Sequence, residues 1–171
     1  PNLKNENITK YFGFDLNNWN LNTGLNFLKK QNYDIQNLIT EQGSYFDFKT
    51  VKKAEIDIAF SQAVCSHLTL NSLIVMLKNL KPKMKSEGVL LSSFIIISND
   101  NENGLELKKK FWKKTNKFNN EPHEVTSFFL KDPYHYDLKT ISKVANICGW
   151  ELYDCKDYDH DLQKMLFFKL I

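Results

Sequence analysis

The clearest pattern of hydrophobic positions lies in the middle of the chain. An apolar run at Ile56–Gln62 is followed by apolar residues at spacings of three and four in Leu70–Leu80, and then by a second apolar run at Val89–Ile97. Runs that are apolar almost throughout are typical of strands in a parallel sheet covered on both faces, whereas the three-and-four spacing predicts an amphipathic helix. The proline and glycine of Pro82–Gly88 indicate where the helix ends and the chain turns. This part of the chain is therefore predicted to fold as strand, helix, turn and strand.

The rest of the chain continues this alternation. Further strands are predicted at 11–16, 37–40, 150–158 and 163–171, and further helices at 18–30, 105–117 and 137–148. The last two strands are joined by a tight connection, which makes them a hairpin and the closing strand antiparallel. We therefore expect an α/β fold with a mostly parallel sheet, helices on both faces and a C-terminal antiparallel β-hairpin.

Length and cysteine content narrow the class of protein. A chain of 171 residues supports one domain, here expected to span residues 1–171 with a polar N-terminal segment at 1–10. No apolar run approaches the roughly 20 residues that span a bilayer, and no secretory signal opens the chain. The three cysteines lack a Cys-x-x-Cys spacing, so they are interpreted as free thiols in a reducing compartment. We expect a cytoplasmic protein that binds no metal and no membrane.

The charged residues are biased toward lysine. All 23 basic residues are Lys, and the net charge is only +3. Arginine normally supplies the bidentate contacts to phosphate and guanine, so its absence weakens the case for a sequence-specific nucleic-acid partner. Lysines interleaved with aromatic residues in 108–114 leave a nonspecific RNA contact open, although a solvated helix face explains them better. By elimination, the sequence favours a small-molecule substrate.

Candidate site residues follow the predicted strands, because ligands of parallel sheets bind beyond the carboxyl ends of the strands. Asp15 ends the first strand, where a carboxylate can accept the protons of both ribose hydroxyls of a nucleotide. The alternative for Asp15 is a turn or helix-capping aspartate. The loop Ser61–His67 follows the predicted strand at Ile56–Gln62, and a histidine such as His67 has an unperturbed pKa near neutrality, as a general base requires. The alternative for His67 is a loop histidine that caps the following helix.

Several short stretches occur together in one order. They are Tyr-Phe-Gly-Phe-Asp-Leu at 11–16, Ile56–Val64 with Ser66–Leu68, Leu-Lys-Pro-Lys-Met-Lys-Ser-Glu-Gly-Val-Leu-Leu at 80–91, Cys148–Trp150, and Gln163–Lys169. This order resembles the class I, Rossmann-like S-adenosylmethionine-dependent methyltransferases, over about residues 11–171. The resemblance implies S-adenosylmethionine as cofactor and methyl transfer to an unidentified small-molecule acceptor. The alternatives are a non-catalytic binding or scaffolding module of the same fold and an RNA-modifying subunit.

The resemblance also assigns roles to residues. Cofactor contacts are expected from Asp15, Leu16, Gly43, Ser44, Ser61, Gln62, Ala63 and Val64. His67 is the candidate catalytic base. Residues 99–136 would form the substrate or lid region, with Tyr134, His135 and Tyr136 facing the acceptor. Packing alternatives stay open, because Gly43 also fits an ordinary turn and the three aromatic residues also fit a plug between the last helix and the sheet.

One part of the family pattern is missing from this chain. The family's first strand carries a glycine-rich loop and lies at the centre of the sheet, between the strands that match Tyr11–Leu16 and Ile56–Gln62. Nothing before Tyr11 has the pattern of that strand. An N-terminal segment outside this numbering, a second polypeptide, or direct pairing of the two flanking strands would each resolve the gap. A resolution is needed because a central gap leaves two buried ladders of backbone groups unpaired. The first is the expectation, and a chain that starts at Pro1 without an initiator Met fits it.

Overall fold

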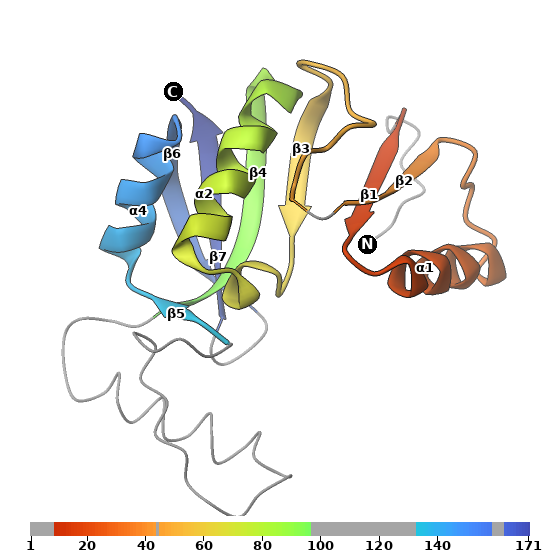
Figure 1. Cartoon of the computed structure of the whole chain (residues 1–171), viewed down its shortest axis with the longest axis horizontal. Helices are drawn as coiled ribbons and strands as arrows, with labels where there is room; N and C mark the ends of the chain where they lie inside the picture. Colours follow the sequence, from red (N-terminus) through yellow and green to blue (C-terminus); the bar gives the residue numbers. More distant parts are fainter. Residues whose placement is uncertain (1–8, 44, 97–132, 159–162) are drawn as a thin grey trace, which may run out of the picture.

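The computed structural model describes residues 9–43, 45–96, 133–158 and 163–171 of the chain (Figure 1). The predicted helix at 105–117, the lysine-rich stretch and Ser44 lie outside these residues. Residues 99–132 of the expected lid region also lie outside the described residues. The prediction of one domain over 1–171 stays a prediction.

The described elements alternate between strands and helices, as the sequence predicts. In chain order they are β1 (Tyr11–Asp15), α1 (Asn18–Lys30), β2 (Leu38–Gln42), β3 (Ile56–Ser61), the 3₁₀ turn η1 (Cys65–His67), α2 (Leu70–Leu80), the 3₁₀ turn η2 (Lys81–Lys83), β4 (Met84–Ile96), β5 (His135–Tyr136), α4 (Leu138–Ile147), β6 (Trp150–Asp157) and β7 (Gln163–Leu170). The bounds of α1 and α2 match those predicted from the spacing of apolar residues.

The described strands form two sheets. In the larger sheet the order is β3-β4-β7-β6, with the short β5 paired to β4. The pairs β3–β4 and β4–β5 are parallel, whereas β7 is antiparallel to both β4 and β6. The smaller sheet is the parallel pair β1–β2. The predicted α/β fold with a mostly parallel arrangement and an antiparallel C-terminal hairpin is confirmed.

The core lies where α2 and α4 pack against the larger sheet (Figure 1). Trp150 of β6 is fully buried, and its indole Nε1–H donates to the Leu77 carbonyl of α2 at 3.0 Å. Phe94 of β4 and Phe168 of β7 are also buried there, with ring centroids 6.2 Å apart. Burial of such large side chains is the main source of folding free energy.

The part of the chain from β1 to β2 (residues 11–42) is here called the β1–β2 unit. It has fewer buried side chains than the larger sheet. Its helix α1 has no buried residue. The unit joins the core through the loop that follows β2, in which Phe48 and Val51 are buried with the residues of α2. Phe14 of β1 packs edge-on against Phe48, with ring centroids 4.9 Å apart.

Two predictions about individual strands are corrected. The second apolar strand was expected to begin at Val89, but β4 begins at Met84, so most of the expected turn is strand. Its register with β3 shifts between Ile56 and Ile58, which accommodates the extra residues as a bulge. Gly88 lies in this bulge, where an added Cβ would come within 3.0 Å of the Ile56 carbonyl. The segment before α4 was expected to be irregular, yet it contains the short strand β5.

Direct pairing of the first strand with the Ile56 strand is also ruled out. Among the described residues, β1 pairs only with β2, and β3 pairs only with β4. The two strands run in the same direction in Figure 1 but belong to separate sheets.

Candidate functional site

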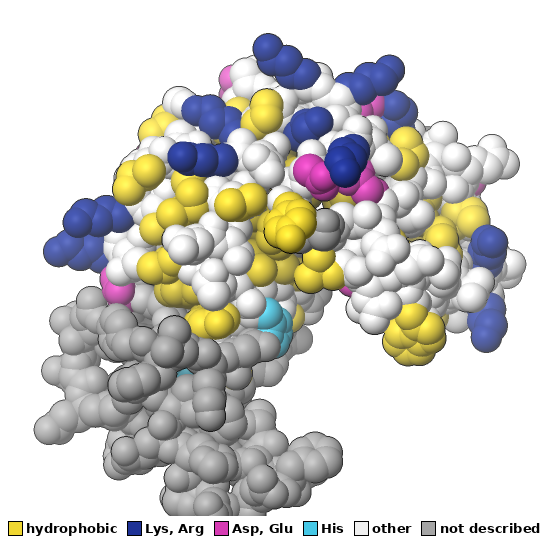
Figure 2. Space-filling view, in the orientation of Figure 1, with side chains coloured by type: hydrophobic (Ala, Val, Ile, Leu, Met, Phe, Trp, Pro, Cys, Tyr) yellow, Lys and Arg dark blue, Asp and Glu magenta, His cyan; other side chains and the backbone are white. Residues whose placement is uncertain are grey.

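The carboxyl ends of β1 and β3 point to the same edge of the molecule (Figure 1). In the space-filling view, the surface is indented at that edge, between the part that carries α1 and the part that carries α2 (Figure 2). The predicted cofactor residues that the structure describes lie in the turns after these strands and after β2. This edge is therefore the candidate site.

Asp15 holds the turn between β1 and α1. Its Oδ1 accepts the backbone N–H of Asn17 at 2.7 Å, and both carboxylate oxygens lie within 3.3 Å of the Asn20 side-chain amide. Asn17 in turn caps α1, because its side chain accepts the N–H of Trp19. The turn-forming alternative for Asp15 is thus observed. A carboxylate has about four acceptor sites, so binding of a ribose diol remains compatible with this role.

The turn after β2 is tied to the turn after β1. The backbone N–H of Gly43 donates to the Asp15 carbonyl at 3.2 Å, and the Gln42 side-chain amide donates to the Leu16 carbonyl at 3.1 Å. The Leu16 side chain is 61% exposed beside them. Asp15, Leu16 and Gly43 are therefore brought together, as the prediction of one cofactor site requires. Ser44 lies outside the described residues.

The turn after β3 is strongly bent. Ala63 has φ +55°, a left-handed conformation that side chains with a Cβ seldom adopt. Its backbone N–H donates to the Ser93 hydroxyl of β4 at 2.7 Å, which holds the bend in place. Gln62, Ala63 and Val64 are exposed. Strained backbone that its surroundings hold in place is common at binding sites.

Within this turn, the thiol of Cys65 is buried and contacts two serine hydroxyls. Cys65 is fully buried, and its Sγ lies 2.8 Å from the Ser92 hydroxyl and 3.8 Å from the Ser61 hydroxyl. Burial raises the pKa of the Cys65 thiol to about 11, against the opposing effect of these two hydrogen bonds. Cys65 is a free thiol, as predicted for all three cysteines, and its burial and raised pKa mark it as a packing residue.

His67 ends the same turn. Its side chain is exposed, and its backbone N–H donates to the Val64 carbonyl at 2.9 Å. The histidine is therefore on the surface next to the exposed residues of the turn. Its role as a general base stays a prediction.

The aromatic residues before α4 pack onto the underside of this turn. Tyr134 donates its backbone N–H to the Ser66 carbonyl, and the Tyr136 hydroxyl donates to the Leu68 carbonyl. His135 and Tyr136 are buried. Burial, with Tyr134 adding to the effect, raises the pKa of Tyr136 to about 12, so this hydroxyl stays protonated as a donor. The placement favours the packing interpretation for His135 and Tyr136, and contact with a substrate stays a prediction.

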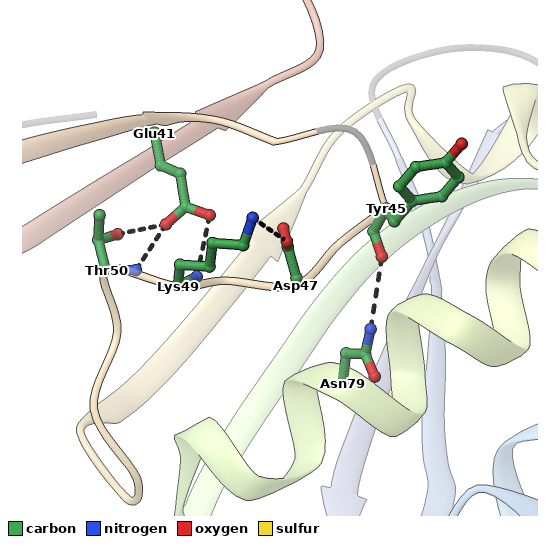
Figure 3. A network of polar contacts seen from close by, with 6 residues as sticks. All are labelled: Glu41, Tyr45, Asp47, Lys49, Thr50 and Asn79. Atoms are coloured by element: carbon green, nitrogen blue, oxygen red, sulfur yellow. Dashed lines mark hydrogen bonds and ion pairs between the residues drawn. The ribbon is translucent and has the colours of Figure 1, made fainter.

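A carboxylate that the sequence analysis did not single out organises the loop after β2 (Figure 3). Glu41 is buried and accepts three hydrogen bonds, from the Lys49 and Thr50 backbone N–H groups and from the Thr50 hydroxyl, at 2.6 to 2.9 Å. Burial raises its pKa, but these hydrogen bonds outweigh burial and leave the pKa of Glu41 below its usual value. The only signal in the sequence is a charged residue near the end of a short apolar strand.

The same loop reaches α2. Asp47 forms an ion pair with Lys49 at 2.8 Å, and the Tyr45 carbonyl accepts the side-chain amide of Asn79 at 3.4 Å (Figure 3). The Lys83 ammonium group donates to the Val51 carbonyl at 2.6 Å. The loop therefore fixes the β1–β2 unit, and with it Asp15, relative to the larger sheet.

The donor and acceptor groups at this edge fit a nucleoside-type cofactor. Asp15 offers carboxylate oxygens for hydroxyl groups, Leu16 offers an exposed apolar surface for a flat base, and residues 62–64 offer exposed backbone. In the described ranges, no group of three or more His, Cys, Asp or Glu residues could hold a metal ion. None of the described helices is both long enough and apolar enough to cross a bilayer.

No protein-family model matches the sequence, and no curated protein matches it. Solved structures match the fold. Mitomycin 7-O-methyltransferase MmcR has a TM-score of 0.68 and 8% identity over 95% of this chain and 42% of its own. The riboflavin-derivative dimethyltransferase RosA from Streptomyces davawensis has a TM-score of 0.67 and 14% identity over 95% of this chain and 42% of its own. LepI in complex with S-adenosylmethionine has a TM-score of 0.60 and 9% identity over 97% of this chain and 37% of its own.

At these identities the matches establish the fold alone, and that fold is the one expected from the resemblance to class I methyltransferases. The chain spans about two fifths of the length of these solved structures, between 37% and 42% in the three cases above.

Proposed function

We propose that this chain forms part of an S-adenosylmethionine-dependent methyltransferase that acts on a small molecule. One observation carries the proposal. Asp15 and the bent turn after β3 lie at the carboxyl ends of parallel strands, at one indented edge, in a fold shared with structures described as small-molecule methyltransferases. Ligands of such sheets bind at this edge.

Each residue at this edge has a defined task in the proposal. Asp15 accepts the hydroxyl protons of the ribose, while Leu16 and Gly43 border the adenine. The exposed backbone of Gln62, Ala63 and Val64 borders the rest of the cofactor. When bound, the cofactor supplies a methyl group on a sulfonium, an activated donor. The protein then contributes mainly by holding the cofactor and the acceptor close together in a reactive orientation, so a strong general base is not required.

The Asp15 carboxylate is tested by a substitution that preserves the turn. In Asp15→Asn, the side-chain carbonyl still accepts the Asn17 N–H, but the charge and the second carboxylate oxygen are lost. We expect calorimetry with S-adenosylmethionine and with its demethylated product to show at least about tenfold weaker binding, as for loss of a charge-assisted hydrogen bond. The titrations use the protein purified from its natural source and the same polypeptide carrying the substitution.

A matched control is available in this chain. Asp34 also accepts the backbone N–H two residues on, that of Gln36 at 2.9 Å, but it lies in the turn after α1. Asp34→Asn should leave cofactor affinity unchanged. Equal affinity of the Asp15→Asn and unsubstituted proteins would contradict the assignment of Asp15.

A non-catalytic module of the same fold is the second candidate. It is favoured by the turn-forming hydrogen bonds of Asp15, which account for this residue without a ligand. Under this candidate, neither S-adenosylmethionine nor its product binds, and Asp15→Asn has no effect beyond stability. Tight binding of the product together with an affinity loss in Asp15→Asn would exclude it.

A further inference from the structure

The loop that follows β2, here called the β2–β3 loop (residues 45–51), has an unfavourable backbone at two positions. Phe46 has φ +55° and Phe48 has φ +46°, in the left-handed region that side chains with a Cβ seldom adopt. Such a backbone persists only where other contacts hold it, and it is often found beside functional sites. The contacts that hold this loop are therefore informative.

The loop folds back over one face of the β1–β2 pair. Phe14 and Glu41 are in register on these parallel strands, so their side chains lie on the same face. The Phe14 ring packs edge-on against Phe48, and the Glu41 carboxylate accepts the hydrogen bonds from Lys49 and Thr50 (Figure 3). One apolar contact and one buried carboxylate thus hold the loop against the two strands.

Among the polar contacts of the described loop residues with one another and with β2 and α2, those of Glu41 are the strongest. Hydrogen bonds to a buried, charged acceptor are stronger than those between neutral groups. The Asp47–Lys49 ion pair lies at the surface, with the Lys49 side chain 80% exposed, where solvent screens it. The bond from the Asn79 amide to the Tyr45 carbonyl is exposed and measures 3.4 Å. The Glu41 carboxylate is therefore the main polar group that sets the conformation of the loop.

The loop contacts the candidate site through Gly43. A Cβ added to Gly43 would lie 3.7 Å from Oε1 of Glu41 and 3.7 Å from Oδ1 of Asp47, so this glycine packs beside both carboxylates. On its other side, the Gly43 N–H donates to the Asp15 carbonyl at 3.2 Å. A shift of the β2–β3 loop would therefore move Gly43 and, with it, the turn that carries Asp15.

We propose that Glu41 is a positioning residue for the cofactor. By holding the backbone of Lys49 and Thr50, its carboxylate keeps Gly43 and Asp15 in the arrangement that binds the nucleoside. Glu41 acts through the loop, because its own carboxylate is buried and already accepts three hydrogen bonds. This inference rests on the proposed function, since it assumes that the cofactor binds at this edge.

The first test measures cofactor affinity in Glu41→Gln. The side-chain NH₂ cannot accept the hydrogen bonds that a carboxylate oxygen accepts, so the loop loses part of its support. We expect calorimetry with the demethylated product of S-adenosylmethionine to show about tenfold weaker binding. The titrations are made at a temperature at which circular dichroism shows every variant to be folded. Glu87→Gln, the same change at an exposed side chain of β4, should leave the affinity unchanged.

A pair of variants at Thr50 keeps the test decisive if Glu41→Gln does not fold. Thr50→Val keeps the shape of the side chain but removes the hydroxyl that donates to Glu41, and it should weaken binding by about threefold. Thr50→Ser keeps the hydroxyl and should bind like the unsubstituted protein. Equal losses in Thr50→Val and Thr50→Ser would overturn the proposal, as would an affinity of folded Glu41→Gln within about twofold of the unsubstituted protein.

Amide hydrogen exchange without cofactor tests the path from Glu41 to the site. In Glu41→Gln, the N–H groups of Lys49, Thr50 and Gly43 should all exchange faster, while the ladder between β3 and β4 should be unchanged. A stability effect confined to the loop would speed exchange at Lys49 and Thr50 only. Unchanged exchange at Gly43 would therefore overturn the positioning role.

The two proposals fail in different ways. If the unsubstituted protein binds neither S-adenosylmethionine nor its demethylated product, the proposed function fails, whatever the variants of Glu41 show. If the unsubstituted protein binds the product and Asp15→Asn weakens binding, but Glu41→Gln does not, the proposed function stands and only the positioning role of Glu41 is refuted.

Discussion

The larger sheet and the β1–β2 unit reach their folded state by different means. The larger sheet buries Trp150, Phe94 and Phe168 almost completely between its strands and two helices. In the β1–β2 unit, no residue of α1 is fully buried, and Trp19 and Phe27 on that helix are 70% and 58% exposed. The first region is stabilised by its own core, whereas the second depends on the loop after β2 and on Glu41.

Because the two regions differ in buried apolar contacts, we expect local opening of the β1–β2 unit and global unfolding of the protein to have different free energies. Regions with few buried apolar contacts open at a lower free energy than the global unfolding of the protein. The candidate site takes Asp15 from the weaker region and Ser61 from the stronger one. Changes in the β1–β2 unit should therefore disturb the site before they disturb the core.

The largest expected effect compares two tryptophans. Trp150→Ala should lower the free energy of unfolding by about 3 to 5 kcal/mol, through the lost burial and the cavity left behind. Trp19→Ala, at an exposed position, should change it by no more than about 0.5 kcal/mol. Urea denaturation followed by circular dichroism measures both. Similar losses for the two variants would mean that α1 packs against more than the described residues provide.

A second effect concerns the carboxylate that holds the loop. Glu41→Gln should lower the stability of the β1–β2 unit by about 1 to 3 kcal/mol, because the side-chain NH₂ cannot accept the hydrogen bonds that a carboxylate oxygen accepts. Amide exchange of β1 and β2 locates the loss. Glu87→Gln, at an exposed side chain of β4, is the control and should change nothing measurable.

The same carboxylate predicts a loss of stability in acid. The pKa of Glu41 lies below the ordinary 4.5 in the folded protein, so its contribution is complete above 4.5 and is lost as the pH falls through the lower folded value. The difference in melting temperature between the unsubstituted protein and Glu41→Gln should shrink over that range. A difference that stays constant at low pH would show that Glu41 is not ionised in the folded state.

The next effect compares two helix caps. Asn17 caps α1 and Asp137 caps α4, where its side chain accepts the Thr140 N–H. Replacing either by Ala should cost about 1 kcal/mol. Asn17→Ala should speed amide exchange in α1 alone, whereas Asp137→Ala should lower the free energy of global unfolding. Equal and global effects would mean that the two regions unfold as one unit.

The smallest effect is at the strained turn. Ala63→Gly should raise the free energy of unfolding by up to about 1 kcal/mol, because glycine adopts a positive φ without strain. Ala145→Gly, in the interior of α4, should lower it by about 1 kcal/mol instead. Thermal unfolding of both variants checks the signs. A loss of stability in Ala63→Gly would show that the turn is not strained.

Local patterns predict much of this fold. The bounds of α1 and α2 follow from apolar spacing and from the capping residues Asn17 and Thr69, which act within one turn of the helix. The start of β4 could not be predicted in this way, because the bulge at Gly88 depends on the close approach of β3. The short strand β5 likewise exists only through its pairing with β4.

The candidate site is predictable to a similar extent. The placement of Asp15 at a strand end follows from the sequence, and so does its alternative role in the turn, which the structure shows. The role of Glu41 does not follow, because its partners Lys49 and Thr50 belong to a loop without a local pattern. Hydrogen bonds that join residues eight or nine positions apart leave no periodic signal in a single sequence.

Because Cys65 is fully buried in the turn after β3, its rate of alkylation can be used to measure local opening at the candidate site. A fully buried thiol with a pKa of about 11 should react with an alkylating reagent only when the protein opens enough to expose it. Cys155, which is only partly buried, provides the faster reference within the same molecule. The ratio of the Cys65 labelling rate to the Cys155 labelling rate therefore reports how often Cys65 becomes exposed to solvent.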